Sequence, residues 1–257
     1  MRAMDWLGLI LGAALGAVAG GAWAQVGHAL DFDGTDDWVM VDDPVNVTGP
    51  LTLEAWIRCD VADGGRIVSN RFGPNGYEMD VSSSNRLRFT VNGSAEGGCD
   101  ITAHVGEWTH VAVTWEGPST GAIVIYVNGE IEDENSRTLP MTDATSHLAV
   151  GVAAWGSYFF DGAIDEVRVF DTVLDQETIR VWMTRRIDAG HPQYAHLQAA
   201  WSFEENGGQV AVDLVSGLEG RLGDAPEADD GDPAWVASGM VARENATWGE
   251  MKALYRR

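Results

Sequence analysis

Acidic residues gather in two short stretches that lie far apart in the chain. Residues 29–41 carry Asp33 and Asp36 around an Asp-Gly turn, and residues 161–171 carry Asp165. Strand and turn signals fill the chain between them, and such a chain brings its first and last strands together by closing a sandwich. Clustered carboxylates are preferred ligands of Ca²⁺. The pattern predicts a Ca²⁺ site, with two turn-forming aspartates and an Asp165 bonded to backbone amides as the alternative.

A second group of residues has the chemistry of a binding surface. Trp155 and Tyr158 lie in an aromatic-rich loop before the last main strand, and Arg71, Asn75 and Tyr77 lie in another loop. Ligand sites combine aromatic faces with a few polar loop groups. We expect these residues to form a rim that binds a glycan or a protein, with core capping as the alternative for the two aromatic residues of the first loop.

Catalytic signals are weak. A glycosidase needs two carboxylates that face each other across a cleft. The nearest candidate, Glu130–Glu134, directly follows the turn signal Asn128-Gly129 and is expected at a solvated hairpin tip. The six histidines include no H-E-x-x-H pattern. The sequence favours a protein without enzymatic activity and keeps a glycoside hydrolase-like enzyme as the alternative.

The first 24 residues have the features of a secretory signal peptide. Arg2 precedes the apolar stretch Leu7–Ala19, and Ala22-Trp23-Ala24 forms a small-x-small cleavage site before Gln25. We expect export to the cell surface or the medium, with the periplasm possible, and no membrane-spanning segment in the mature chain.

The net charge limits the classes of partner that we expect, and the two cysteines allow a disulfide. Acidic residues number 39 against 16 Lys and Arg, giving a net charge of −23. Such a surface repels nucleic acid and anionic membranes, so neither is an expected partner. Cys59 and Cys99 are the only cysteines, and export permits a disulfide between them. We expect that disulfide, with two separate buried thiols as the alternative.

Period-two alternation predicts an all-β fold. Thr52–Arg58 alternates apolar and polar side chains, and Tyr77–Val81 and Arg86–Val91 flank a short turn as a hairpin. Ile123–Val127 leads into the Asn-Gly turn. One helix is predicted after Asp175, which suits an N-cap, because apolar residues then recur at helical spacing.

Five blocks of the sequence carry a family resemblance. ALDFDGTDDWV, LTLEAWIR, GEWTHVAVTWEG, IVIYVNGE and FDGAIDEVRVFDTVL occur in this order over residues 28–187. They resemble a laminin-G-like domain of the concanavalin A-like lectin/glucanase superfamily. The resemblance implies a jelly-roll β-sandwich of two packed antiparallel sheets, with a short helix after the last main strand. It also implies a structural Ca²⁺ between the first and last strand regions, held by Asp33 and Asp165 with Asp36.

The predicted organisation has four parts. Residues 1–24 are the signal peptide, 25–187 the sandwich with its trailing helix, 188–240 an extension that packs back on it, and 241–257 a linker and short helix. The fold hosts many functions. We expect a secreted recognition or adhesion module that binds glycan or a surface protein. A structural surface or appendage component, docked to a partner through Thr247–Arg257, is a further alternative.

Overall fold

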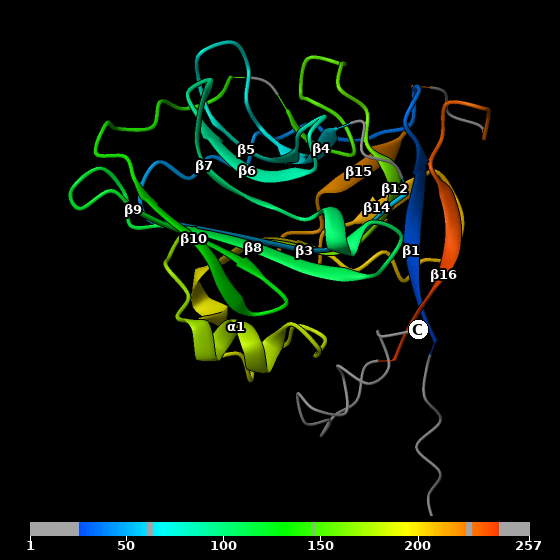
Figure 1. The fold of residues 1–257 in the computed structure, drawn as a ribbon. Helices are drawn as coiled ribbons and strands as arrows, with labels where there is room; N and C mark the ends of the chain where they lie inside the picture. The colour runs from blue at the N-terminus through cyan, green and yellow to red at the C-terminus, as the bar shows by residue number, and fades with distance from the viewer. Residues whose placement is uncertain (1–25, 61–63, 146, 225–227, 242–257) are drawn as a thin grey trace, which may run out of the picture.

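The chain folds into a sandwich of two antiparallel β-sheets (Figure 1). The computed structural model describes residues 26–60, 64–145, 147–224 and 228–241. These residues include one short α-helix, so the predicted fold class is confirmed. The predicted signal peptide and the predicted helix Thr247–Arg257 lie outside the described residues.

The sheet that we call sheet 1 is built around the long strand β12. Its spatial order is β10 (Glu130–Ser136), β9 (Ala122–Val127), β8 (Thr109–Trp115), β3 (Leu51–Cys59), β12 (Asp161–Phe170), β1 (Val26–Asp33) and β16 (Ala234–Val241), while β13 (Leu197–Trp201) also pairs with β12.

Sheet 2 lies across the core from sheet 1. Its spatial order is β14 (Val210–Val212), β15 (Glu219–Leu222), β2 (Val39–Val41), β11 (Leu148–Val150), β4 (Gly65–Ser69), β5 (Tyr77–Val81), β6 (Arg86–Val91) and β7 (Ser94–Asp100). The helical elements are α1 (Gln176–Trp182) and the 3₁₀ turns η1 (Thr102–His104) and η2 (Tyr194–His196).

Side-chain alternation assigns each strand a core face. On β3, the buried Leu53, Ala55 and Ile57 point into the main hydrophobic cluster between the sheets, as predicted. Glu54 and Trp56 alternate with them and therefore occupy the outer face of sheet 1. This division leaves each sheet an outer face whose chemistry differs from that of the core.

A β-bulge in β12 lets the two halves of this strand pair with different neighbouring strands. Residues 161–164 pair with β1, and residues 167–170 pair with β13. The register against β3 shifts between Asp165 and Arg168, where Glu166 adopts a φ of +50°. The extra residue turns the strand, which is how one long strand reaches two neighbours on the same side.

The helix α1 covers the outer face of sheet 1 (Figure 1). Asp175 is its N-cap, as predicted, because its side chain accepts the N–H of Thr178 at 2.7 Å. Ile179 then packs with Phe170 of β12 and Leu197 of β13. The described part of the chain has no helix with the length and apolar character needed to span a membrane.

The segments after α1 add strands to both sheets. β13 and β16 join sheet 1, and β14 and β15 join sheet 2. Asp213, which is 1% exposed, accepts backbone N–H groups from Ala200 at 2.6 Å and Ser216 at 2.7 Å. This buried carboxylate therefore fastens the loop after β14 to β13.

The predicted disulfide is not formed. Cys59 and Cys99 are both free and buried. Cys59 ends β3 of sheet 1, and Cys99 lies on β7 of sheet 2. Burial raises the pKa of Cys59 to about 12 and that of Cys99 to about 11, so both thiols stay protonated at neutral pH.

Replacing Asp213 should destabilise the fold without touching any candidate site. Asp213→Ala leaves the buried N–H of Ala200 without its acceptor, and we expect a loss of about 3 kcal/mol. The midpoint of thermal unfolding should fall by roughly 10 °C. The exposed Asp143→Ala is the matched control and should unfold like the wild type. Equal midpoints for the two variants would show that this carboxylate does not fasten the extension.

Candidate functional site

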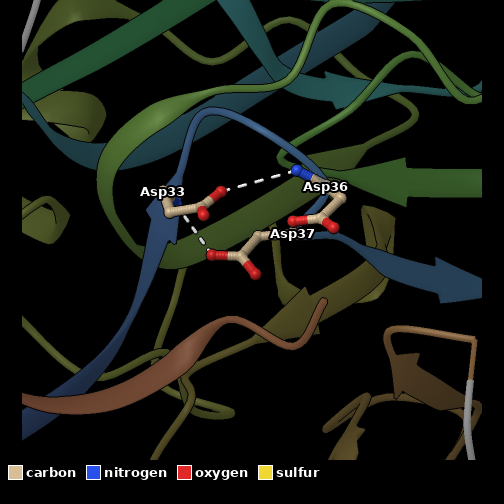
Figure 2. Close-up of side chains that lie close together, drawn as sticks. All are labelled: Asp33, Asp36 and Asp37. Atoms are coloured by element: carbon tan, nitrogen blue, oxygen red, sulfur yellow. Dashed lines mark hydrogen bonds between the residues drawn. The ribbon is translucent and has the colours of Figure 1, made fainter. Parts of the chain in front are cut away.

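Three aspartates gather at the turn that follows β1 (Figure 2). One carboxylate oxygen from each of Asp33, Asp36 and Asp37 lies within 4.8 Å of those of the other two. Asp33 Oδ1 accepts the N–H of Thr35 at 2.7 Å, and Asp37 Oδ2 accepts the N–H of Asp33 at 2.7 Å. The turn therefore folds through its own aspartates, which holds their carboxylates together.

Gly34 allows this turn to form beside β12. Its φ is +77°, a conformation that L side chains rarely adopt, and a Cβ placed on it would lie 2.8 Å from Cβ of Asp161. The Asp-Gly pair is thus required by both backbone conformation and space.

Asp37 has the properties of a cation ligand. Its side chain is 4% exposed, and its Oδ1 has no hydrogen-bond partner. Burial raises the pKa of Asp37 to about 6, and the charges of Asp33 and Asp36 add to that rise. A buried carboxylate with an unpaired oxygen is costly, and a divalent cation would remove the cost. The donor set, all carboxylate oxygen, fits Ca²⁺.

Asp165, in contrast, does not join this cluster. The register partner of Asp33 on β12 is Asp161, and Asp165 lies four residues further along, about 13 Å at the usual rise of a strand. Asp165 is buried at the bulge, where its Oδ1 accepts the N–H of Glu166 at 2.7 Å. The prediction that Asp165 meets Asp33 and Asp36 is therefore wrong.

Asp37 was missed because the sequence presents it as one more acid in a polar turn. The available signal was its position two residues before the buried strand β2. Period-two alternation carried back from Val39 places Asp37 on the inward side.

A second constellation lies on the outer face of sheet 2. We call Arg66, Arg71, Glu78, Trp155 and Tyr158 the arginine–aromatic cluster. The guanidinium of Arg66 lies 4.3 Å from the ring centre of Tyr158, and that of Arg71 lies 4.6 Å from the ring centre of Trp155. The two rings stand edge to face, with centres 6.2 Å apart. Cation–π contacts of this geometry fix both rings.

Glu78 organises the two arginines from beneath. It is 1% exposed, and its Oε1 lies 3.1 Å from Arg66 Nη2 and 3.2 Å from Arg71 Nη1. Its Oε2 accepts the hydroxyl of Ser69 at 3.2 Å. One buried carboxylate thus sets both cations, and through them both rings, in fixed positions.

The loop between β11 and β12 presents the aromatic pair. Val152, Ala154 and Phe159 pack on Met40 and Ala149, which are side chains of the outer face of sheet 2. The apolar residues of the loop therefore anchor it on the sheet.

Tyr158 itself is held by its backbone and remains largely open. It adopts a φ of +62°, and its carbonyl accepts the N–H of Arg66 at 3.1 Å. The side chain of Tyr158 is 58% exposed, and Trp155 is half-buried. Phe72, which follows Arg71 in the chain, is 47% exposed. The cluster can therefore offer a ring face and guanidinium donors to a ligand.

The structure sorts the predicted ligand residues into two groups. Arg71, Trp155 and Tyr158 come together, and Asn75 closes the turn after Arg71 through backbone hydrogen bonds with Phe72. Tyr77 is fully buried, and its hydroxyl donates to the carbonyl of Val45 at 2.9 Å, so its assignment as a ligand residue is wrong.

Arg66 and Glu78 were missed because their role depends on strand pairing. The pairing of β4 with β5 shifts register between Arg66 and Val68, and this pairing brings Arg66 and Glu78 beneath the loop between β11 and β12. A search for basic residues at outer positions of neighbouring strands would have found Arg66.

Buried charges also occupy the outer face of sheet 1. Glu54 is fully buried, with Arg168 Nη1 3.7 Å and His110 Nε2 3.9 Å from its carboxylate oxygens. Burial raises the pKa of Glu54 to about 7, and Arg168 opposes the rise. Arg168 also donates to the carbonyls of Trp182 and Arg185, which cover this face. In this conformation a substrate has no access to Glu54.

The acidic run after the Asn-Gly turn forms part of a strand. Glu130–Ser136 forms the edge strand β10, and Asp133 Oδ2 accepts the N–H of Gly98 of β7 at 2.8 Å. The run is therefore a strand and not the hairpin tip that the sequence predicted.

Comparison with known proteins supports the fold. A family model described as the concanavalin A-like lectin/glucanases superfamily matches residues 33–180. No curated protein is a significant match to the sequence.

Solved structures show the same likeness. A candidate carbohydrate-binding protein from Bacteroides ovatus has a TM-score of 0.63 at 20% identity, covering 81% of this chain and 61% of its own. The chain thus spans less than two thirds of that protein. A heptameric SAP-like pentraxin from Limulus polyphemus has a TM-score of 0.46 at 19% identity, covering 60% of this chain and 81% of its own.

A third similar structure is domain 4 of an extracellular arabinanase from Geobacillus stearothermophilus, solved with arabinotriose. Its TM-score is 0.45 at 19% identity, and the match covers 60% of this chain and 75% of that one. At 20% identity, the similarity to the Bacteroides ovatus protein shows a shared fold.

The buried Glu54 should make stability depend on pH. Its pKa is about 7 in the folded chain and 4.5 ordinarily, so between these values the folded state keeps a proton that the unfolded state releases. Stability should therefore fall as pH rises from 4.5 to 7, by ~3 kcal/mol from this group.

Denaturant unfolding at several pH values checks this dependence. Glu54→Gln should lack the part of the fall due to this group, whereas the exposed Glu132→Gln should keep the wild-type slope. A Glu54→Gln profile parallel to the wild type would contradict the assignment.

Proposed function

We propose that this chain, which belongs to the concanavalin A-like lectin/glucanases superfamily, is a non-enzymatic module that recognises glycans. The observation that carries the proposal is the arginine–aromatic cluster, in which Trp155 and Tyr158 are held by two arginines on an open sheet face. The similarity in fold to a candidate carbohydrate-binding protein supports it.

The chemistry of the cluster suits a sugar. The apolar face of a pyranose or furanose ring packs on an aromatic ring, and its hydroxyl groups accept hydrogen bonds from fixed donors. Tyr158 is 58% exposed, and the guanidinium groups of Arg66 and Arg71 lie over the rings of Tyr158 and Trp155. Because Glu78 already holds both arginines, little side-chain entropy is lost when the ligand binds.

The proposal includes export. The pattern of residues 1–24 suggests that the module acts outside the cytoplasm, in the medium, at the cell surface or in the periplasm. Glycans of surfaces and extracellular matrices are accessible there. Recognition of a surface protein through the same aromatic rim is the alternative within this proposal.

Removal of either ring should weaken glycan binding. A panel of immobilised neutral and acidic glycans identifies a binder, and isothermal titration then compares the variants. We expect Trp155→Ala and Tyr158→Ala each to weaken binding by about tenfold, equivalent to ~1.4 kcal/mol. Tyr194→Ala is the matched control, because Tyr194 is a 38% exposed tyrosine of η2, outside the cluster.

Two results would argue against the cluster as the binding site. The first is a glycan that binds the wild type and both cluster variants equally. The second is a comparable loss of binding in Tyr194→Ala. Far-UV circular dichroism of each variant ensures that the comparison is made between folded proteins.

We further propose that Asp33, Asp36 and Asp37 hold a structural Ca²⁺. The orphaned Oδ1 of Asp37 and the spacing of the three carboxylates support this assignment. The ion would neutralise part of their charge and fix the turn between β1 and β2. Asp37 takes the place that the sequence assigned to Asp165.

Thermal unfolding with EDTA and with millimolar Ca²⁺ tests this assignment. A ligand of the folded state at 100 times its Kd stabilises by about 2.7 kcal/mol, so the wild-type Tm should rise by roughly 5–10 °C. Asp37→Asn should lose the shift, and Asp165→Asn should retain it. A wild type that responds identically to EDTA and Ca²⁺ would refute the calcium site.

A further inference from the structure

A row of charged side chains crosses sheet 2 beside the aromatic pair. Arg66 of β4 pairs with Asp80 of β5, and Asp80 pairs in turn with Arg88 of β6. Their neighbours in sequence point into the core, so these three side chains occupy the outer face of the sheet. The guanidinium of Arg66 lies 4.3 Å from the ring centre of Tyr158. The row therefore begins at the arginine–aromatic cluster and extends it across β5 to β6.

The carboxylates of this face do not match its guanidinium groups in number. Asp80 is fully buried, and its Oδ1 accepts hydrogen bonds from Arg88 Nε at 2.8 Å and Nη2 at 2.6 Å. Glu78 is shared by the other two arginines, since its Oε1 lies 3.1 Å from Arg66 Nη2 and 3.2 Å from Arg71 Nη1. Three guanidinium groups thus share two carboxylates, and the five side chains together carry one positive charge.

Of these five side chains, the cationic ones are those that a ligand can reach. Glu78 and Asp80 are at most 1% exposed. The side chains above them are more open, with exposed fractions of 10% for Arg66, 19% for Arg71 and 31% for Arg88. In the described part of the chain, Nε of Arg66 and Nε of Arg71 have no hydrogen-bond partner. Neither guanidinium therefore has all of its donors in use within the protein.

An anionic group is the ligand that this face favours. Guanidinium groups bind carboxylates and similar oxyanions through charge-assisted hydrogen bonds, which are roughly twice as strong as neutral ones. A neutral sugar accepts hydrogen bonds from the same donors, but it covers the positive charge without compensating it. The net charge of −23 repels an anion at long range, yet salt screens this repulsion beyond about 8 Å. Direct contact with the arginines therefore decides the preference.

We propose that the arginine–aromatic cluster, together with Arg88, selects glycans that carry a carboxylate or a sulfate beside the sugar ring that packs on Tyr158 or Trp155. The guanidinium groups of Arg66 and Arg71 bind the anion, and Arg88 extends the positive face along the bound chain. This inference rests on the proposed function and names the chemical class of its ligand.

A glycan array printed with matched pairs tests the selection. Each anionic glycan stands beside its neutral form: polygalacturonate and hyaluronan beside their methyl esters, and kappa-carrageenan beside its desulfated form. The wild-type chain should bind at least one anionic glycan more tightly than its neutral form by about tenfold or more. The first two pairs report on a carboxylate and the third on a sulfate, so the selected pair identifies the anion.

Substitutions of Arg71 connect the preference to the cluster. Arg71→Gln removes one positive charge beside Trp155 and leaves Glu78 paired with Arg66, so the preference should fall below about threefold. Arg71→Lys keeps the charge and should retain a preference above that value. Arg221→Gln is the matched control, because it removes one positive charge from an exposed residue of β15 in the same sheet and should keep the wild-type preference. Thermal unfolding of each variant ensures that folded proteins are compared.

The outcomes separate this inference from the proposed function. Equal binding of anionic and neutral forms by the wild type would overturn the selection and leave glycan recognition standing. A preference that persists unchanged in Arg71→Gln would also overturn it, because the anion would then be bound away from the cluster. A wild type that binds no glycan of the array, charged or neutral, would overturn both.

Discussion

The pairing of β12 with its neighbours is the interaction on which both candidate sites depend. β12 lies between β3 and β1 in the middle of sheet 1, and its bulge at Glu166 lets its second half pair with β13. This ladder sets Asp161 beside the turn after β1. It also fixes the end of the loop that carries Trp155 and Tyr158, since that loop leads directly into β12. A shift of register by one residue would move every side chain of the strand to the opposite face.

The two outer faces of the sandwich differ in how far other segments cover them. The outer face of sheet 1 is covered by α1 and the segment after it, and its charges, Glu54 and Arg168, are buried. The outer face of sheet 2 is covered only in part, by a loop whose apolar residues pack down and whose aromatic rings remain partly open. The partly open face of sheet 2 is therefore the face to which we assign the proposed recognition, whereas the carboxylate of Glu54 on sheet 1 is covered.

Local patterns predicted the fold well. Alternation in Thr52–Arg58 identified the core face of β3, and Asn128-Gly129 identified a hairpin because both residues have positive φ. These features depend on neighbours in sequence. The same reasoning failed for Asp165, because a bulge and a four-residue offset along β12 decide which acid meets Asp33. Such offsets are set by pairing between distant strands and are not visible in one strand.

The candidate sites were predicted only in part for the same reason. Trp155, Tyr158 and Arg71 were found from loop composition, but Arg66 and Glu78, which hold them, required the register of β4 with β5. The cysteines show the limit of counting residues. Their even number suggested a bond that their places on opposite sheets do not form.

A crystal structure of the chain with a bound glycan tests the central claim most directly. The glycan should be the strongest binder from an unbiased panel, soaked or co-crystallised at several times its Kd. The account predicts a sugar ring against Tyr158 or Trp155, with its oxygen atoms within hydrogen-bond distance of Arg66 or Arg71. A glycan bound on the opposite face, beside α1, with the arginine–aromatic cluster unoccupied, would contradict it.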